Sequence, residues 1–172
     1  MIHLNLGSNL VSTYGTKFNN LQIAINLLIQ SKIKIIKISN IYETPSYPNN
    51  NFPKFLNMGI IVDYNDNHFN LFKIIKIIEK KIGRIKTKKN EPRVIDIDII
   101  DFKNIIENSK NLVLPHPKCH LRNFVLYPIS QIDPIWSHPI LKKNAQYLIN
   151  NLSRKSRIEI TRLKKNVNIK YD

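Results

Sequence analysis

The two aspartates Asp96 and Asp98 are candidate metal ligands, because both are acidic and they stand two positions apart in the chain. They lie in the segment 91–100, where polar and apolar residues alternate with the two-residue period of a β-strand. Both carboxylates would face one side of that strand, about 7 Å apart. If both were charged they would repel by about 2 kcal/mol at an effective dielectric constant of about 20. A divalent cation removes this penalty, and magnesium prefers one or two carboxylates together with substrate phosphates.

The alternative to a metal site is that both carboxylates lie on the solvated outer face of an amphipathic edge strand. The spacing alone favours neither interpretation. Basic residues precede the aspartates: Arg84, Lys86, Lys88, Lys89 and Arg93. A charge run is usually a solvated surface. Its position directly before the aspartate strand favours a functional role instead.

Hydrophobic periodicity predicts the elements that must position these residues. The order is a strand at residues 2–6, a helix for which Thr16 is the N-cap, strands at 33–42 and 55–64, a helix at 71–82 that Gly83 ends, and the aspartate strand. This order predicts an α+β, ferredoxin-like antiparallel sheet, with helices packed on one face and an open substrate cleft on the other. The proline-rich loop 44–53 is long enough to suspect a function.

The chain is less regular after Phe102. Short helices are expected at 123–131, despite Pro128, and at 145–152. The basic tail from Arg154 is either disordered or an added strand. We find no repeat and no second core in the sequence, so residues 1–172 are expected to form one domain.

Composition narrows the class of protein. The formal net charge is +15, which suits a polyanionic partner, although a codon bias towards lysine explains it equally well. Cys119 is the only cysteine, so no intramolecular disulfide can form, and a small buried hydrophobic role is favoured over a nucleophile. The N-terminus does not read as a signal peptide and no apolar run approaches a membrane span, so we expect a cytoplasmic protein without a membrane partner.

Several separated motifs point to one family. They are Leu6-Gly7-Ser8-Asn9-Leu10, Ser39-Asn40-Ile41-Tyr42-Glu43-Thr44-Pro45, Phe55-Leu56-Asn57, Glu79 with Gly83-Arg84, Pro92-Arg93 with Asp96 and Asp98, Pro115-His116-Pro117, and Arg122-Asn123-Phe124. In this order they resemble the 6-hydroxymethyl-7,8-dihydropterin pyrophosphokinases of folate biosynthesis. Each motif alone is weak, but together they are highly specific and extend from residue 6 to about residue 136.

The resemblance implies that a pyrophosphoryl group passes from ATP to the hydroxymethyl group of the pterin, with release of AMP. Such a reaction depends on positioning and electrostatic stabilisation. The resemblance implies two Mg²⁺ ions held by Asp96 and Asp98. It assigns catalytic roles to Arg84, Arg93, Asp96 and Asp98. It assigns ATP binding to Glu79, Lys86, Lys89, Arg93, Ile99, His116 and Arg122. The partners are the two substrates alone, and we expect a monomer that binds no nucleic acid.

For the pterin, the resemblance assigns Gly7, Thr44, Pro45, Tyr47, Phe55, Asn57 and Phe124. Aromatic rings stack on a flat heterocycle, and an asparagine offers it both a donor and an acceptor. Ordinary core packing is the alternative for Phe55 and Phe124. Phe55 and Asn57 would point to the same side of their strand, opposite its apolar stripe, which argues against core packing for Phe55. An exposed helix acid is the alternative for Glu79.

One loop departs from the family pattern. Many relatives carry an Arg-Trp pair before the Pro-Arg motif, where this chain has Lys88-Lys89-Asn90-Glu91. Lys89 is the candidate replacement for the arginine, and Lys86 stands where an arginine is common. Lysine is a poorer bidentate clamp than arginine, so an altered lid and a weaker grip on ATP are expected. The competing class is a basic, ferredoxin-like RNA-binding module, which would bind single-stranded RNA with a steep salt dependence and would have no use for the aspartate pair.

Overall fold

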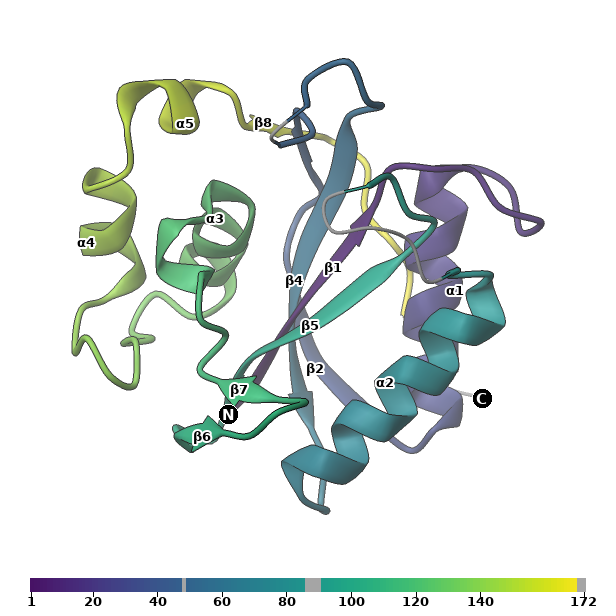
Figure 1. The fold of residues 1–172 in the computed structure, drawn as a ribbon, viewed down its shortest axis with the longest axis horizontal. Coiled ribbons are helices and arrows are strands. Elements are labelled where there is room, and N and C mark those ends of the chain that lie inside the picture. Colours follow the sequence, from purple (N-terminus) through teal and green to yellow (C-terminus); the bar gives the residue numbers. More distant parts are fainter. Residues whose placement is uncertain (48, 86–90, 170–172) are drawn as a thin grey trace.

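The computed structural model describes residues 1–47, 49–85 and 91–169. A six-stranded sheet crosses the molecule in the order β5-β1-β4-β3-β8, with β2 also paired to β4 (Figure 1). Its strands are β1 (Ile2–Ser8), β2 (Lys34–Ile38), β3 (Tyr42–Thr44), β4 (Phe55–Asp63), β5 (Asp96–Phe102) and β8 (Thr161–Arg162). A small ribbon joins β6 (Glu107–Asn108) and β7 (Val113–Leu114). The helices are α1 (Lys17–Gln30), α2 (His68–Ile82), α3 (Asn123–Ile132), α4 (Ala145–Asn150) and α5 (Arg154–Ile158), with a 3₁₀ turn at Cys119–Leu121.

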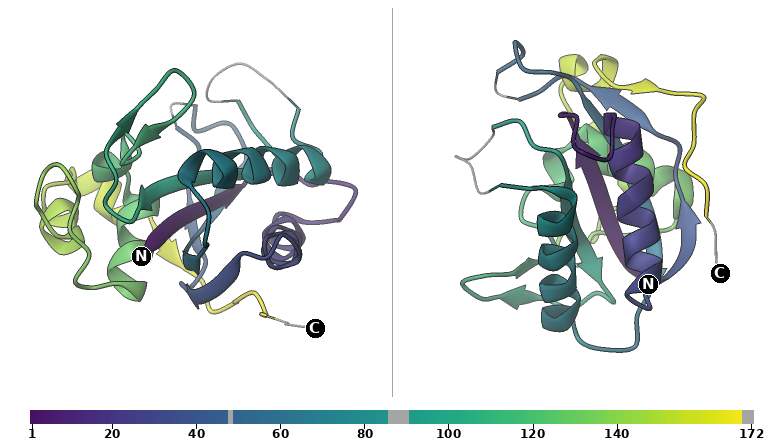
Figure 2. Two further views of the ribbon diagram at one scale, coloured as in Figure 1. Left: turned by 90° about the horizontal axis from the view of Figure 1, so that it is seen from below. Right: turned by 90° about the vertical axis from the view of Figure 1, so that its right-hand side faces the viewer.

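Helices α1 and α2 lie side by side over one face of the sheet (Figure 2). The N-cap predicted at Thr16 is confirmed, because its hydroxyl accepts the backbone N–H of Asn19. The predicted end of α2 at Gly83 is confirmed too, since this residue has a φ of 106°, which glycine adopts without strain. The buried faces of both helices pack on the alternate apolar residues of β1, β4 and β5, and this packing forms the main core.

The predicted antiparallel α+β fold is confirmed, with one addition on the second face. Helices α3 and α4 cover part of that face and enclose a second apolar cluster that includes Ile100, Leu126 and Trp136. Helix α3 approaches β4 at Gly59, where an added Cβ would lie 2.8 Å from Cβ of Pro128. These helices therefore occupy part of the face that the sequence predicts to be open.

The prediction of one continuous strand at 33–42 is wrong, because the segment is divided into β2 and β3. The register of β2 on β4 shifts between Ile35 and Lys37. At Ser39 the side-chain hydroxyl accepts the backbone N–H of Gly59, replacing the main-chain acceptor of a regular ladder. Residues with β-branched side chains favour an extended backbone, but they do not reveal where a side-chain hydroxyl replaces a main-chain acceptor.

The tail from Arg154 is ordered as far as the described residues extend, so the disordered alternative is wrong for them. After α5 it adds β8 to the free edge of β3, which confirms the added strand. It then continues along α1, where the side-chain amide of Gln22 exchanges two hydrogen bonds with the backbone of Asn168. Among the described helices, none is long and apolar enough to cross a membrane.

Candidate active site

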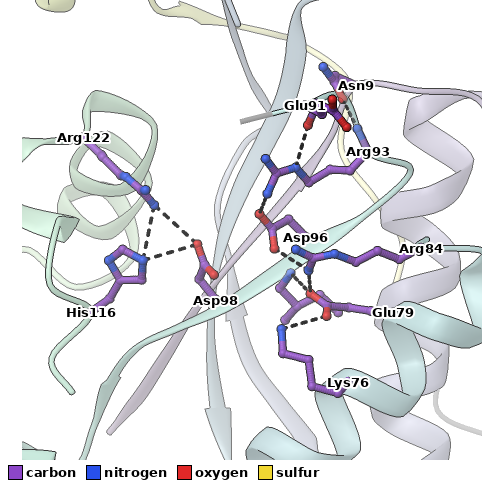
Figure 3. A network of polar contacts seen from close by, with 11 residues as sticks. Asn9, Lys76, Glu79, Arg84, Glu91, Arg93, Asp96, Asp98, His116 and Arg122 are labelled. Atoms are coloured by element: carbon purple, nitrogen blue, oxygen red, sulfur yellow. Dashed lines mark hydrogen bonds and ion pairs between the residues drawn. The ribbon is translucent and has the colours of Figure 1, made fainter. Parts of the chain in front are cut away.

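The two aspartates point to the same side of β5, as their spacing predicts. In the antiparallel ladder, Asp96 stands opposite Gly7 and Asp98 opposite Asn5 of β1. Ile97 and Ile99 point the other way and are buried beneath α1 and α2. Strand β5 lies at the edge of the sheet, so basic side chains can reach the carboxylates from both sides (Figure 3).

Asp96 is held by two arginines from the segment before β5. Arg84 Nη1 lies 2.6 Å from Asp96 Oδ1, and Arg93 Nη1 lies 2.7 Å from Asp96 Oδ2. Arg84 also pairs with Glu79, which is almost fully buried at the end of α2. The carboxylate of Glu79 accepts the backbone N–H of Ile97 at 2.8 Å and so ties α2 to β5.

Lys76 Nζ provides a further contact for Glu79, at 2.8 Å from Oε2. Glu79 therefore supports Arg84 on the Asp96 side of the site, whereas Asp98 lies on the side of His116 and Arg122 (Figure 3). The alternative of an exposed helix acid is wrong, because only 2% of Glu79 is accessible to solvent. That Glu79 contacts ATP stays a prediction.

Asp98 faces His116 and Arg122, which arrive from the chain beyond the β6–β7 ribbon. Its Oδ2 lies 3.7 Å from His116 Nε2 and 3.5 Å from Arg122 Nη1. Burial, together with the charge of Asp96, raises the pKa of Asp98 to about 7. Burial and the charge of Arg122 lower the pKa of His116 to about 4, so this ring is neutral at neutral pH. Its Nδ1 accepts the backbone N–H of Lys118, which leaves the proton of the neutral ring on Nε2, facing Asp98.

The residues expected at the pterin lie beside this acidic pair. Gly7 is flanked in the sheet by Asn57 on β4 and by Asp96 on β5. With strands about 4.8 Å apart, the Cα atoms of Asn57 and Asp96 are separated by about 10 Å. Asn57 is buried and its amide donates to Thr44 Oγ1 at 3.0 Å. A Cβ on residue 7 would lie 3.0 Å from Asn57 Oδ1, so glycine leaves room for this amide.

The remaining expected residues lie around the same end of the sheet, with differing exposure. Thr44 is buried at the end of β3, whereas Tyr47 is 85% exposed. Phe124 begins α3 and lies under the guanidinium of Arg122, 5.4 Å from the ring centre. Because the side chain of Ile99 is in the core, a contact between this residue and ATP would be made by its main chain. Lys86 and Lys89 lie outside the described residues, so their expected roles stay predictions.

A second group of ligating atoms lies elsewhere, under α3 and α4. Ligand atoms of Cys119, His120 and His138 are within 4.8 Å of one another. His138 Nδ1 accepts the backbone N–H groups of Ile140 and Leu141, so its other nitrogen carries the proton in the neutral ring. Burial raises the pKa of the Cys119 thiol to about 12. Cys119 is buried within the apolar cluster beneath α3 and α4, which confirms its predicted buried role.

An antiparallel α+β sheet that presents two carboxylates among arginines is typical of domains that act on phosphorylated ligands with the help of cations. A family model described as 7,8-dihydro-6-hydroxymethylpterin-pyrophosphokinase (HPPK) matches residues 3–134. The chain belongs to this family, which confirms the resemblance carried by its motifs.

Relatives include a 2-amino-4-hydroxy-6-hydroxymethyldihydropteridine pyrophosphokinase of Aquifex aeolicus, which is 35% identical over 142 residues, or 83% of this chain and 86% of the relative. The folic acid synthesis protein fol1 of Schizosaccharomyces pombe is 32% identical over 151 residues, covering 87% of this chain but 20% of the relative. Among solved structures, wild-type Plasmodium falciparum HPPK-DHPS superimposes with a TM-score of 0.68 at 17% identity, covering 94% of this chain and 47% of that one. The chain thus spans about a fifth of fol1 and under half of the Plasmodium chain.

Proposed function

We propose that this protein transfers the terminal pyrophosphoryl group of ATP to the hydroxymethyl group of 6-hydroxymethyl-7,8-dihydropterin and releases AMP. One observation carries the proposal: Asp96 and Asp98 project from one face of β5, among arginines, and Asp96 stands in the same sheet register as Gly7 and Asn57. This arrangement would place a phosphate chain and a pterin next to each other. Family membership makes the same substrates the expected pair.

The acidic pair suits magnesium. Both side chains offer carboxylate oxygens, the ligands that magnesium prefers. The raised pKa of Asp98 indicates that the second negative charge is poorly compensated by the protein alone. We propose that Asp96 and Asp98 hold two Mg²⁺ ions. When bound, the ions would neutralise charge on the phosphates and on the departing AMP oxygen.

The protein's own cations would bind and orient the triphosphate. In the structure Arg84 and Arg93 both donate to Asp96. A phosphate chain offers these guanidinium groups an alternative bidentate acceptor, so we infer that they shift towards ATP when it binds. Arg122 and the neutral Nε2–H of His116 would donate to the same chain from the opposite side. Holding ATP from two sides orients the β-phosphorus towards the attacking hydroxyl.

Asn57 would select the pterin. Its nitrogen is already oriented by the hydrogen bond to Thr44, and its oxygen lies over Gly7. The planar amide can thus present a donor and an acceptor to one edge of the ring in a fixed orientation. Phe55 and Phe124 are the proposed stacking partners for the two faces of that ring. The assignments to a monomer and to the cytoplasm stay predictions.

The nucleotide product tests the proposal. Purified protein is incubated with ATP, Mg²⁺ and the hydroxymethyl dihydropterin, and the nucleotides are separated. We expect AMP to form in equal amount to the pyrophosphorylated pterin. Formation of ADP, or no turnover, would contradict the proposed reaction.

The metal role is tested by Asp96→Asn and Asp98→Asn, each expected to lower turnover more than about a hundredfold because charge stabilisation is lost. Asp63→Asn, at an exposed position on β4, is the matched control and should retain activity. Wild-type activity in both site variants would refute metal binding by this pair.

A further inference from the structure

Asn9 connects three segments that surround the candidate site. It follows β1 and is 2% exposed, although its side chain is fully polar. Its amide nitrogen donates to Ser46 Oγ at 3.2 Å and to the backbone oxygen of Pro53 at 3.1 Å. Its amide oxygen accepts the backbone N–H of Arg93 at 2.7 Å (Figure 3). One side chain thus uses both ends of its amide to join the loop 44–53 to the segment before β5.

On one side, Asn9 closes the base of the loop 44–53. Ser46 Oγ donates to the same Pro53 oxygen at 3.0 Å, so the three groups form a closed triangle. The proposed pterin residues Thr44, Pro45 and Tyr47 lie at one end of this loop. Phe55 lies just past the other end. The position of the proposed pterin residues at the two ends of this loop therefore depends on the closure.

On the other side, Asn9 fixes the backbone of Arg93. Besides the bond to the amide oxygen, the carbonyl of Arg93 accepts the backbone N–H groups of Asn9 and Leu10, at 3.1 Å and 3.3 Å. With its backbone held in this way, Arg93 directs its guanidinium to Asp96 Oδ2 at 2.7 Å. A continuous series of contacts thus runs from the pterin loop through Asn9 and Arg93 to a metal-binding carboxylate.

We propose that Asn9 is a positioning residue that sets the distance between the pterin pocket and the phosphate-binding arginine. The inference rests on the proposed function, since it assigns the loop 44–53 to the pterin and Arg93 to ATP. Asn9 itself is not among the residues assigned to either substrate. Its effect comes from ordering the loop 44–53 and Arg93 before the ligands bind, which reduces the entropic cost of binding.

The test distinguishes the role of the amide nitrogen of Asn9 from that of its amide oxygen. Asn9→Ala removes both, and we expect KM for the pterin to rise about tenfold and KM for ATP to rise several-fold, because buried hydrogen-bonding groups lose their partner. Ser46→Ala weakens only the loop closure, so KM for the pterin should rise while KM for ATP stays unchanged. The double variant should resemble Asn9→Ala alone, because both changes open one triangle.

Asn20→Ala is the matched control. Asn20 is another fully buried asparagine, and its amide donates to Ser8 Oγ and to the carbonyls of Leu10 and Val94. None of these bonds reaches the loop 44–53. The control should lower the melting temperature about as much as Asn9→Ala and leave KM for the pterin within about twofold.

Backbone hydrogen exchange provides a readout that needs no turnover. In Asn9→Ala we expect faster exchange at Arg93, whose backbone N–H loses its acceptor, and at Phe52, whose N–H donates to the carbonyl of Asn49 within the loop. Asn20→Ala should leave exchange at Phe52 as in wild type. If wild type releases no AMP, the proposed function fails and exchange alone decides the role of Asn9. If wild type is active but Asn9→Ala leaves KM for the pterin unchanged, or Asn20→Ala raises it equally, the positioning role is refuted.

Discussion

Replacing Asp98 with asparagine should stabilise the ligand-free fold at pH 8 while it abolishes activity. In the folded protein the pKa of Asp98 is raised from 3.8 to about 7 by burial and by the charge of Asp96. In the unfolded chain the same group ionises near its ordinary pKa. The folded state therefore binds the proton more tightly, and unfolding becomes easier as the pH rises from about 4 to about 7. Asparagine removes this penalty because it never ionises.

The difference between the two pKa values corresponds to about 4 kcal/mol, at about 1.4 kcal/mol for each pH unit. The side chain of Asp98 is 27% exposed, so screening by solvent reduces the expected gain to about 1–2 kcal/mol. For a chain of 172 residues this is a rise of about 5 °C in melting temperature. The gain is fully developed above pH 7 and absent below about pH 4.

Thermal unfolding of wild type and Asp98→Asn between pH 4 and pH 8.5, in the presence of a chelator, measures this effect. Excess Mg²⁺ should narrow the difference at pH 8, because the ion supplies wild type with the missing positive charge. Asp63→Asn serves as the exposed control and should show no pH-dependent gain. A melting temperature for Asp98→Asn at or below that of wild type at pH 8, or a difference independent of pH, would refute the reasoning.

Three further outcomes are expected. Asn57→Ala should raise KM for the pterin about a hundredfold, because two hydrogen bonds to the ring are lost, while KM for ATP in the same steady-state assay changes little. Glu79→Ala should lower the free energy of unfolding in urea by about 3 kcal/mol and raise KM for ATP, since Arg84 loses a buried partner; unchanged stability would contradict this. Gly59→Ala should cost about 1–3 kcal/mol by the same unfolding measurement, because the new methyl group meets Pro128 at 2.8 Å.

Much of the fold could be predicted because its elements are locally encoded. The capping hydroxyl of Thr16 and the left-handed backbone of Gly83 are properties of a few adjacent residues. The break at Ser39 could not be predicted, since it depends on a hydrogen bond to Gly59, 20 positions away. For a similar reason, the sequence did not reveal that α3 covers part of the second face. Pro128 of α3 fits against the sheet only because residue 59 of β4 is a glycine.

The candidate site divides in the same way. The direction of Asp96 and Asp98 follows from the pleat of a single strand, so their spacing was sufficient to predict a shared face. Asn9 was visible only as part of a turn-like motif, because its partners Ser46, Pro53 and Arg93 lie 37 to 84 positions away. The one signal in the sequence was an asparagine directly after Gly7-Ser8, and the residue type does not reveal that its side chain is buried.

Local geometry and residue identity were sufficient to predict most strands, the two helix ends, the common side of the two carboxylates and, through the motifs, the family. The packing of the whole chain determines which cations face which carboxylate, and it buries Glu79 next to Arg84. It alone decided that one asparagine joins the loop 44–53 to Arg93. The physical reason is that hydrogen bonds and ion pairs between distant segments depend on how the sheet and its loops pack, and the residue types offer many equally plausible partners.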